Sequence, residues 1–589
     1  MSSFPAMDGR LNSAELHSVP PPASVGRALT PREFARAKSP RGRMLGIVSG
    51  GSCLLVLLVL YSAFVGRFFY GVSSGPFLMS TSFGLPAATV EAGVWPAYDH
   101  PVCGWDGQFY YHQSNDPFLL GDGAKYLDNP SYRYQRNLIP VVAYVTSRLG
   151  GWSVTPPAWY QFVQLAFTAL GFGALAQLLR EFRVSPWWSF VWLLSGGLIW
   201  SLFRGLPDAP ADALFILSLA ALHRGGLGLY VPATSLLLLC REGYAAFAAA
   251  VFGLTCCGSV PWRTTLPRWL QAGLTALPGV IVLAWAAYVA QRLDLPLLAG
   301  SKSVPWGGLV DWPLFSAVRY LKTASESQAS FELVYKSVTL FTLVVVFAYT
   351  LRNRNRSPIY AASLPYQLLV MMTGDIIWAD ASGYLKACSA VLVIGMLLLR
   401  ESPRPLLYAA LTASLLVGVH CNYKKNYRHV GGNLTPVAVL PEEVREPRIH
   451  RPPPTPQEEL GELHGAVRAT ALPSQQVATA SLLSLRPRPF LLYEVTVENL
   501  GDVIWRQSAP GVNRVCLRIV LTNSAGETVF EGRRFLRQDV APGESLRMTA
   551  SLPAPRKPGD YRVRLHMIEE GREVTAVEAG DYLHSIHLP

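Results

Sequence analysis

Charged residues are scarce in this sequence. Asp, Glu, Lys and Arg together make up 15% of its 589 residues, and 50% are hydrophobic. Soluble proteins usually carry about 25% charged residues, so the composition excludes an ordinary soluble enzyme and predicts an integral membrane protein. The net charge of +12 does not indicate a nucleic-acid partner, because much of it lies in short loops between apolar runs, where arginine sets membrane orientation.

Cysteine is also scarce, with eight residues scattered through the chain. They form no CxxC pair and show no Cys/His spacing typical of zinc ligands. The sequence therefore excludes a disulfide framework and predicts no structural zinc site.

The first long apolar run, Met44 to Val65, is long enough to span a bilayer. It follows a tail, residues 1–43, that is rich in Pro, Ser and Arg. The run lacks a small-residue cleavage site at a suitable distance, and its basic leader is long for a signal peptide. We therefore expect an uncleaved first helix with a cytoplasmic N-terminus.

Ten further apolar segments are expected to cross the membrane, which gives about eleven transmembrane helices. Each loop predicted to lie inside is basic, as the positive-inside rule requires. Several segments are shorter than the roughly 20 residues usually needed and must include flanking sequence. The ten segments are Ala158 to Leu179, Trp187 to Leu202, Ala209 to Leu222, Leu227 to Cys240, Gly243 to Cys257, Leu270 to Ala290, Tyr335 to Tyr349, Tyr360 to Thr373, Ala387 to Leu399 and Leu406 to His420.

With this orientation, residues 69–157 form a large outer loop, and everything after Cys421 lies outside. Residues 422–480 are rich in proline and are predicted to be a linker. In residues 481–589 the hydrophobic period changes to two, with short runs separated by turn residues. This pattern predicts a periplasmic all-β domain, an immunoglobulin-like sandwich of about 100 residues. Tyr561 is interpreted as a strand residue, with a tyrosine corner as the alternative.

The outer loop contains the stretch Gly-Trp-Asp-Gly-Gln-Phe-Tyr-Tyr-His at 104–112 and, later, Tyr-Arg-Tyr-Gln-Arg at 132–136. Asp106 lies in the first stretch, and Arg133 and Arg136 lie in the second. A carboxylate that takes a proton, aromatic faces for sugar rings and arginines for phosphate suit glycosyl transfer at a membrane surface. The alternative is a turn with an exposed aspartate and interfacial tyrosines.

Other polar residues interrupt apolar sequence at the predicted outer face. Arg241 and Glu242 form a tight turn between two helices, where Arg241 either binds a donor phosphate or pairs with Glu242 to hold the hairpin. Asp208 and Asp212 open a helix, as acidic first-turn residues commonly do. A third outer cluster consists of Asp375, Asp380 and Lys386. Its lysine is a candidate phosphate ligand, and the alternative is a set of solvated loop charges.

The order of a basic tail, a first helix, a long outer loop with these two stretches and a multi-helix bundle resembles the GT-C superfamily of bacterial membrane glycosyltransferases. The resemblance covers residues 44–421 and is strongest in Asp106 to Tyr111 and Tyr132 to Pro140. It implies transfer of a sugar, with inversion, from a polyprenyl-phosphate donor to a glycan, lipid or protein acceptor at the outer face of the bacterial inner membrane. A first-outer-loop aspartate lies at the active site in that family, which makes Asp106 the expected general base.

The resemblance and the residue types together define the expected site. Donor phosphate is expected at Arg133, Arg136, Arg241 and Lys386; acceptor or sugar at Trp105, Gln108, Tyr110 and Tyr111; and support from Glu242, Asp208, Asp212 and Asp380. Many members carry two acidic residues where Trp105 and Asp106 stand here. No metal-binding pair is therefore predicted, and a divalent cation stays open as a cofactor.

Two other classes of function compete with this one. A flippase or transporter of lipid-linked glycans would be favoured by internal repeats or by broken helices in matching halves, and the sequence shows neither convincingly. A non-catalytic cell-envelope polysaccharide assembly protein, in which the C-terminal sandwich does the binding, would need one membrane anchor. The ten further helices favour the glycosyltransferase.

Overall fold

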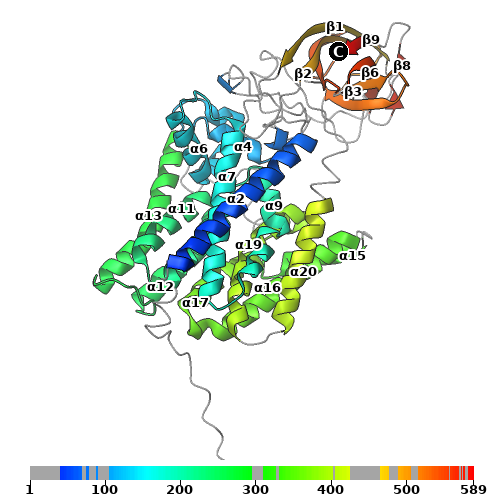
Figure 1. Ribbon diagram of the computed structural model, residues 1–589. Helices are drawn as coiled ribbons and strands as arrows, with labels where there is room; N and C mark the ends of the chain where they lie inside the picture. Colours follow the sequence, from blue (N-terminus) through cyan, green and yellow to red (C-terminus); the bar gives the residue numbers. More distant parts are fainter. Residues whose placement is uncertain are drawn as a thin grey trace, which may run out of the picture.

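The computed structural model describes residues 40–68, 75–77, 86, 88–89, 105–294, 310–326, 330–401, 405–424, 464–476, 489–505, 515–536, 538–555, 557–569, 572–573, 575–576 and 582–588. Most of the predicted cytoplasmic tail, of residues 69–104 and of the predicted linker lies outside the described residues. The rest of the chain forms a helical bundle followed by two β-sheets (Figure 1).

Six helices in the described residues are long and apolar enough to cross a membrane. Each contains one of the predicted segments, so a multi-pass membrane protein is consistent with the fold. They are α2 (Pro40–Phe68), α7 (Pro157–Glu181), α13 (Arg268–Arg292), α16 (Ser330–Asn353), α19 (Ala381–Leu398) and α20 (Pro405–Cys421).

The other five predicted spans are too short to cross a membrane as single helices, so the described residues do not show eleven full-length spans. Four are single helices of 12 to 16 residues: α10 (Asp208–His223), α11 (Leu227–Cys240), α12 (Ala245–Cys256) and α17 (Pro358–Met371). The fifth, 187–202, is divided among η4 (Pro186–Trp188), α8 (Ser189–Leu193) and α9 (Gly196–Phe203).

The division of segment 187–202 has a local cause. The Ser195 hydroxyl accepts a hydrogen bond from the Leu198 amide at 3.3 Å, which caps a new helix. Gly197 then packs against α19 so closely that a Cβ would lie 2.2 Å from the Leu385 carbonyl oxygen. The chain therefore restarts its helix where glycine permits backbone contact.

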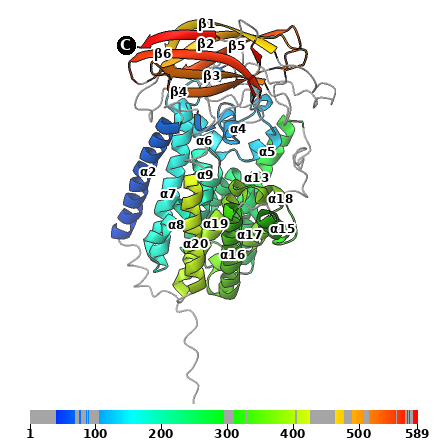
Figure 2. The same ribbon diagram turned by 90° about the vertical axis from the view of Figure 1, so that its right-hand side faces the viewer.

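Alternate helix connections gather at the two ends of the bundle. At one end, Arg224 pairs with Glu181 at 2.7 Å, and Arg356 pairs with Glu401 at 2.5 Å. These residues lie in or beside the loops predicted to be inside. The sheets lie beyond the opposite end, near α4 (Gly107–Gln113) (Figure 2). Each of these ion pairs thus joins two loops that the charge pattern assigns to the same side.

Two short helices of the outer loop, α5 (Pro130–Gln135) and α6 (Leu138–Leu149), lie at the end of the bundle near the sheets (Figure 2). The Trp285 indole of α13 donates to the Tyr134 carbonyl at 2.7 Å, which ties α13 to the outer loop. Two further short helices, α15 (Phe315–Glu326) and α18 (Asp375–Ala379), lie beside each other.

The C-terminal part contains two sheets around one buried core. The first has the strand order β5-β2-β1-β8 and the second β4-β3-β6-β7, with β9 also paired to β6. Val495, Trp505 and Leu517 lie in the shared core. The strands are β1 (His464–Gln476), β2 (Pro489–Asn499), β3 (Val515–Asn523), β4 (Thr528–Phe535), β5 (Ser545–Pro553), β6 (Gly559–Glu569), β7 (Arg572–Glu573), β8 (Thr575–Ala576) and β9 (Tyr582–Leu588).

One detail of the sheets differs from expectation. Strand β1 falls inside the predicted linker 422–480, because its proline and weak alternation hide a strand that is defined by antiparallel pairing with β2. Tyr561 lies in strand β6, as expected, and also donates its hydroxyl hydrogen to the Lys557 carbonyl at 2.8 Å. A tyrosine that bonds back to the backbone a few residues upstream is the contact that defines a tyrosine corner.

The arrangement of the ends predicts the topology. Alkaline phosphatase fused after Pro589 should be active, and green fluorescent protein fused there should be dark, because the sheets lie opposite the basic end. Fusions after Arg356, at the basic end, should give the reverse result. Fluorescence without phosphatase activity at Pro589 would contradict the predicted orientation.

Candidate functional site

The turn that carries Asp106 is packed directly on the end of α9. A Cβ added to Gly107 would lie 1.6 Å from the Arg204 carbonyl oxygen, so only glycine fits at this position. Beside this contact, the Arg204 guanidinium carbon lies 3.5 Å from the centroid of the Trp105 ring. The outer loop and the α9–α10 connection are therefore fixed against each other at Asp106.

The Asp106 carboxylate is paired but open to solvent. Its Oδ1 accepts a hydrogen bond from Arg133 Nη2 at 3.0 Å, and its side chain is 56% exposed, whereas that of Arg133 is 6% exposed. Asp128 holds the same guanidinium from Oδ1 at 2.9 Å and from Oδ2 at 2.7 Å. Asp106 thus keeps an accessible oxygen while its orientation is fixed.

Two opposing effects act on the pKa of Asp106. The surrounding protein desolvates the carboxyl and raises its pKa, but the positive charges of Arg133, Lys386 and Arg136 lower it further than desolvation raises it. The net pKa lies below the usual value for aspartate. Asp106 is consequently ionised at neutral pH, in the form that accepts a proton or a hydroxyl hydrogen bond.

A second ion pair joins the outer loop to the turn between α11 and α12. Arg136 Nε donates to Glu242 Oε2 at 2.9 Å, and Arg136 Nη2 donates to Oε1 at 2.5 Å. The Arg136 guanidinium carbon also lies 4.2 Å from the Tyr132 ring centroid. Arg136 and Glu242, which are 106 positions apart in the sequence, are therefore held together in a bidentate geometry.

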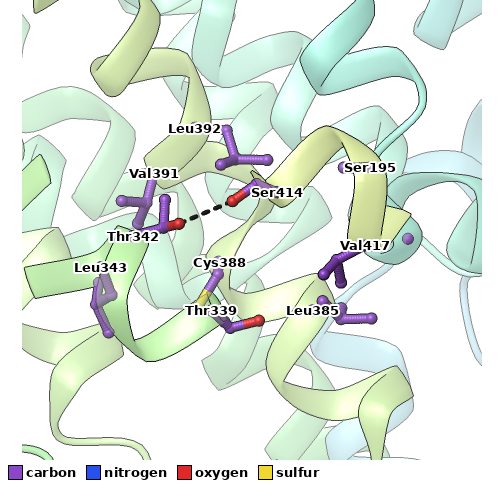
Figure 3. A pocket seen from close by; sticks show the side chains of 11 residues that line it. Ser195, Thr339, Thr342, Leu343, Leu385, Cys388, Val391, Leu392, Ser414 and Val417 are labelled. Atoms are coloured by element: carbon purple, nitrogen blue, oxygen red, sulfur yellow. Dashed lines mark hydrogen bonds between the residues drawn. The ribbon is translucent and has the colours of Figure 1, made fainter. Parts of the chain in front are cut away.

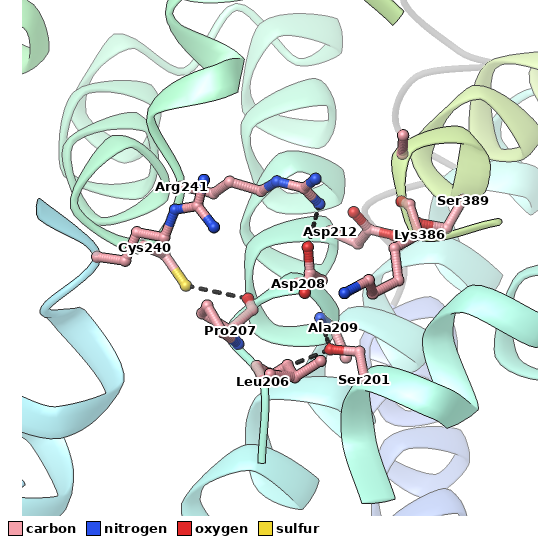
Figure 4. A network of polar contacts seen from close by, with 12 residues as sticks. Ser201, Leu206, Pro207, Asp208, Ala209, Asp212, Cys240, Arg241, Lys386 and Ser389 are labelled. Carbon is pink, nitrogen blue, oxygen red and sulfur yellow. Dashed lines mark hydrogen bonds and ion pairs between the residues drawn. The ribbon is translucent and has the colours of Figure 1, made fainter. Parts of the chain in front are cut away.

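A third group of charges lies at the start of α10. Arg241 forms an ion pair with Asp208, and Lys386 of α19 points toward the same carboxylate (Figure 4). The Cys240 thiol donates to the Pro207 carbonyl at 3.3 Å, which fixes the end of α11 against the start of α10. The structure thus gathers seven predicted site residues in one network: Asp106, Arg133, Arg136, Asp208, Arg241, Glu242 and Lys386.

The predicted sugar-binding side chains of α4 lie beneath this network. All seven residues of α4 are buried, including Gln108, Tyr110 and Tyr111. The Tyr111 hydroxyl donates to the Thr155 carbonyl at 2.9 Å, and its ring stacks on Phe77 with centroids 5.2 Å apart. Their burial does not agree with a role in contacting a sugar, whereas half-buried Trp105 stays at the site.

The two remaining predicted residues have different positions. Asp212 is fully buried one turn below Asp208, where it accepts hydrogen bonds from Trp192 Nε1 at 3.2 Å and the Tyr244 hydroxyl at 2.5 Å. It supports the helix packing rather than contacting a ligand. Asp380 is exposed at the end of α18, and its charge acts on Arg204.

Three contributors to the site were not predicted: Asp128, Trp200 and Arg204. Asp128 could have been suggested by its position just before α5, five residues before Arg133. Trp200 and Arg204 lie in an apolar segment that contains no motif, and nothing in the sequence shows that they meet Trp105. Their contribution depends on the close approach at Gly107.

A small, mainly apolar cavity lies between α9, α16, α19 and α20 (Figure 3). Leu385, the neighbour of Lys386, lines it, and Thr342 and Ser414 share a hydrogen bond of 2.8 Å in its wall. The lining is mainly apolar with a few hydroxyls: Ser195, Gly196, Thr339, Thr342, Leu343, Leu385, Cys388, Val391, Leu392, Ser414 and Val417.

Within the described residues, no group of three or more His, Cys, Asp or Glu side chains is arranged to hold a metal ion. The acidic residues of the network face arginines instead: Asp106 and Asp128 face Arg133, and Glu242 faces Arg136. The donor set observed here suits anions and hydroxyl groups.

Comparisons with known proteins identify no family. No protein-family model and no curated protein matches this chain. One similar solved structure is described as "X-ray structure of Northeast Structural Genomics Consortium target SoR45". It has a TM-score of 0.13 and 15% identity, and the match covers 21% of this chain and 82% of that chain. A similarity at this level carries no argument about fold or function.

Glycine at position 107 should be essential. Gly107→Ala should lower the free energy of unfolding by roughly 1–3 kcal/mol or more, because the new methyl group overlaps the Arg204 carbonyl. Gly243→Ala is the matched control, since a Cβ there meets nothing within 4 Å. Thermal unfolding in detergent measures both. Equal melting temperatures for the two variants would contradict the packing described here.

His112 should make the fold sensitive to acid. It is 1% exposed, neither ring nitrogen has a partner in the described residues, and burial lowers its pKa from 6.5 to about 4. At pH 5 the unfolded chain therefore binds a proton that the folded chain does not. Lowering the pH from 7.5 to 5 should cost roughly 2 kcal/mol of stability through this residue.

Melting curves of His112→Phe at the two pH values check this expectation. The variant removes the titrating group and fills the same apolar space, so its melting temperature should depend less on pH. His587→Phe, at a position whose side chain is 72% exposed, should behave like the parent. The same pH dependence in His112→Phe and the parent would refute the assignment.

Proposed function

We propose that this chain is a GT-C-type membrane glycosyltransferase that transfers a sugar from a polyprenyl-phosphate donor to a glycan, lipid or protein acceptor. One observation carries the proposal. An accessible carboxylate, Asp106, lies at the end of a helical bundle beside arginine and lysine side chains from three separate segments of the chain. These groups lie far apart in the sequence, and the fold brings them together.

The arrangement suits transfer from a phosphate-linked sugar. Departure of the lipid phosphate requires nearby cations, which Arg136, Arg241 and Lys386 supply. Attack by the acceptor requires a group that orients the hydroxyl and removes its proton, which Asp106 supplies. Its low pKa makes it a weak base, so its main contribution is to position the hydroxyl and take the proton as the sugar–oxygen bond forms. Such a group contributes on the order of 10²–10⁴-fold.

The cavity of Figure 3 is narrow, but its lining is mainly apolar and includes Leu385, the residue before Lys386. If the surrounding helices separate, it would accept part of a hydrocarbon chain rather than a sugar. A donor with its phosphate at Lys386 would place its tail among the helices while its sugar faced the outer end. A soluble nucleotide-sugar would have no use for this lining.

The finer features of the architecture belong to the same proposal. We infer that the five shorter helices complete eleven crossings with flanking sequence, which places the N-terminus in the cytoplasm of a bacterial cell. The charged network and the sheets would then face the periplasm. The two sheets, their shared core and the Tyr561 hydrogen bond support an immunoglobulin-like module that assists the membrane enzyme.

Asp106→Asn tests the proposal. The amide keeps the size of the side chain but loses the basicity, so sugar transfer in membranes should fall by roughly 10²-fold or more with donor binding retained. Transfer is measured with radiolabelled polyprenyl-phosphate sugar. Asp122→Asn is the control, because Asp122 is exposed and pairs with Lys125 away from the network.

Two results would overturn the assignment. Parent-level transfer by a normally accumulated Asp106→Asn variant would show that Asp106 is not the base. Absence of transfer by the parent protein, together with movement of lipid-linked glycan across proteoliposomes, would favour a flippase or transporter.

A further inference from the structure

Arg204 occupies an unusual position next to the proposed base. It lies at the end of α9 and is 8% exposed. Its guanidinium carbon is 2.9 Å from the centroid of the Trp200 ring and 3.5 Å from that of Trp105, and the two ring centroids are 6.4 Å apart. The cation is therefore held between two indole rings.

The Arg204 side chain has no anionic partner among the described residues. Arg133, Arg136 and Arg241 each form an ion pair with a carboxylate. The Arg204 side chain instead forms no hydrogen bond or ion pair there, and its Nε is buried without a partner. Cation–π contacts offset only part of the cost of leaving a buried charge without an ion pair. An additional anion would offset that cost.

Arg204 and Lys386 are both coupled to Asp106. The negative charge of Asp106 interacts with the positive charges of both Arg204 and Lys386. Lys386 and Arg241 share Asp208, while the other carboxylate that acts on Arg204 is Asp380. Lys386 and Arg241 thus form one group of cations, and Arg204 forms a second. The carboxylate of Asp106 interacts with both groups.

We propose that Arg204, held between Trp105 and Trp200, is a second anion subsite that binds an oxyanion carried by the acceptor saccharide. This identity of the ligand rests on the proposed function, since the group around Lys386 is there assigned to the donor phosphate. A planar guanidinium with free N–H groups binds a carboxylate or a phosphate in a bidentate manner. The flanking indole rings offer flat surfaces to the attached sugar.

The geometry also explains why the residue is an arginine. A guanidinium is planar and stacks between aromatic rings, whereas an ammonium group is compact and strongly hydrated. Lysine at this position would keep the charge but lose the stacking and the paired N–H groups. The acceptor is therefore an acidic glycan, with either an acidic sugar or a phosphate-bearing unit next to the attacked hydroxyl.

Binding to the full chain in detergent tests the proposal without any transfer reaction. The probes are methyl β-D-glucuronide, a carboxylate, and inorganic phosphate, with neutral methyl β-D-glucoside as the control. Tryptophan fluorescence reports binding, because Trp105 and Trp200 touch the guanidinium. At least one of the two anions should give a saturable change in the parent that the glucoside does not give, and the anion that does so identifies the source.

Matched variants locate the response. Arg204→Gln should weaken the binding of that anion roughly 10-fold or more, since hydrogen bonds to a charged group are lost. Arg204→Lys should also weaken it, and this variant retains the buried charge if Arg204→Gln fails to fold. Lys125→Gln, at an exposed lysine that pairs with Asp122 away from the network, should leave the response unchanged.

Several results would overturn the proposal. These are equal binding by Arg204→Gln and the parent, an equal loss of the response in Lys125→Gln and Arg204→Gln, or no response of the parent to either anion. The binding experiment does not depend on sugar transfer. A parent protein that binds an anion through Arg204 but transfers no sugar would therefore contradict only the proposed function. Sugar transfer by a parent protein that binds neither anion would contradict only the proposed anion subsite.

Discussion

Most cations at the end of the bundle near the sheets are held by a carboxylate from another part of the chain. Arg136 reaches Glu242, and Arg241 reaches Asp208, so the outer loop, the α11–α12 turn and α10 are tied together by charge. Charges in a partly dry environment are tolerated when they are paired, and breaking one pair leaves the other partner uncompensated. The position of Asp106, and with it the proposed chemistry, depends on this set of pairs and on the glycine contact at Gly107.

The sequence was informative where local pattern determines structure. Apolar runs predicted where helices lie, and basic loops predicted which helix ends lie together, as the Arg224–Glu181 pair illustrates. Helix length was less predictable, because the break after Leu194 depends on Ser195 as a cap and on Gly197 meeting α19. Such a break is decided by a neighbour distant in sequence, which no local pattern records.

The site divides in the same way. Arg241 could be identified because a charge inside apolar sequence is costly without a partner or a role. Asp106 and Arg133 could be identified because a carboxylate, aromatic rings and arginines occur together in the two outer-loop stretches. Tyr111 and Gln108 were misplaced, because aromatic and amide side chains suit both a sugar surface and a core, and the segments that cover α4 lie elsewhere in the chain. Arg204 was missed for the complementary reason, since its environment consists of two rings 95 positions apart in sequence.

The bidentate pair between Arg136 and Glu242 has a consequence for selectivity. In the resting protein the carboxylate occupies the hydrogen-bonding positions that a phosphate would use, so it behaves as a tethered competitor. A small monovalent ion such as chloride offers too little charge and too few acceptor atoms to displace it. A phosphate-linked lipid, delivered at high local concentration by the bilayer, offers both. We expect the site not to bind the simple salts of the surrounding solution and to bind phosphate-bearing ligands that arrive through the membrane.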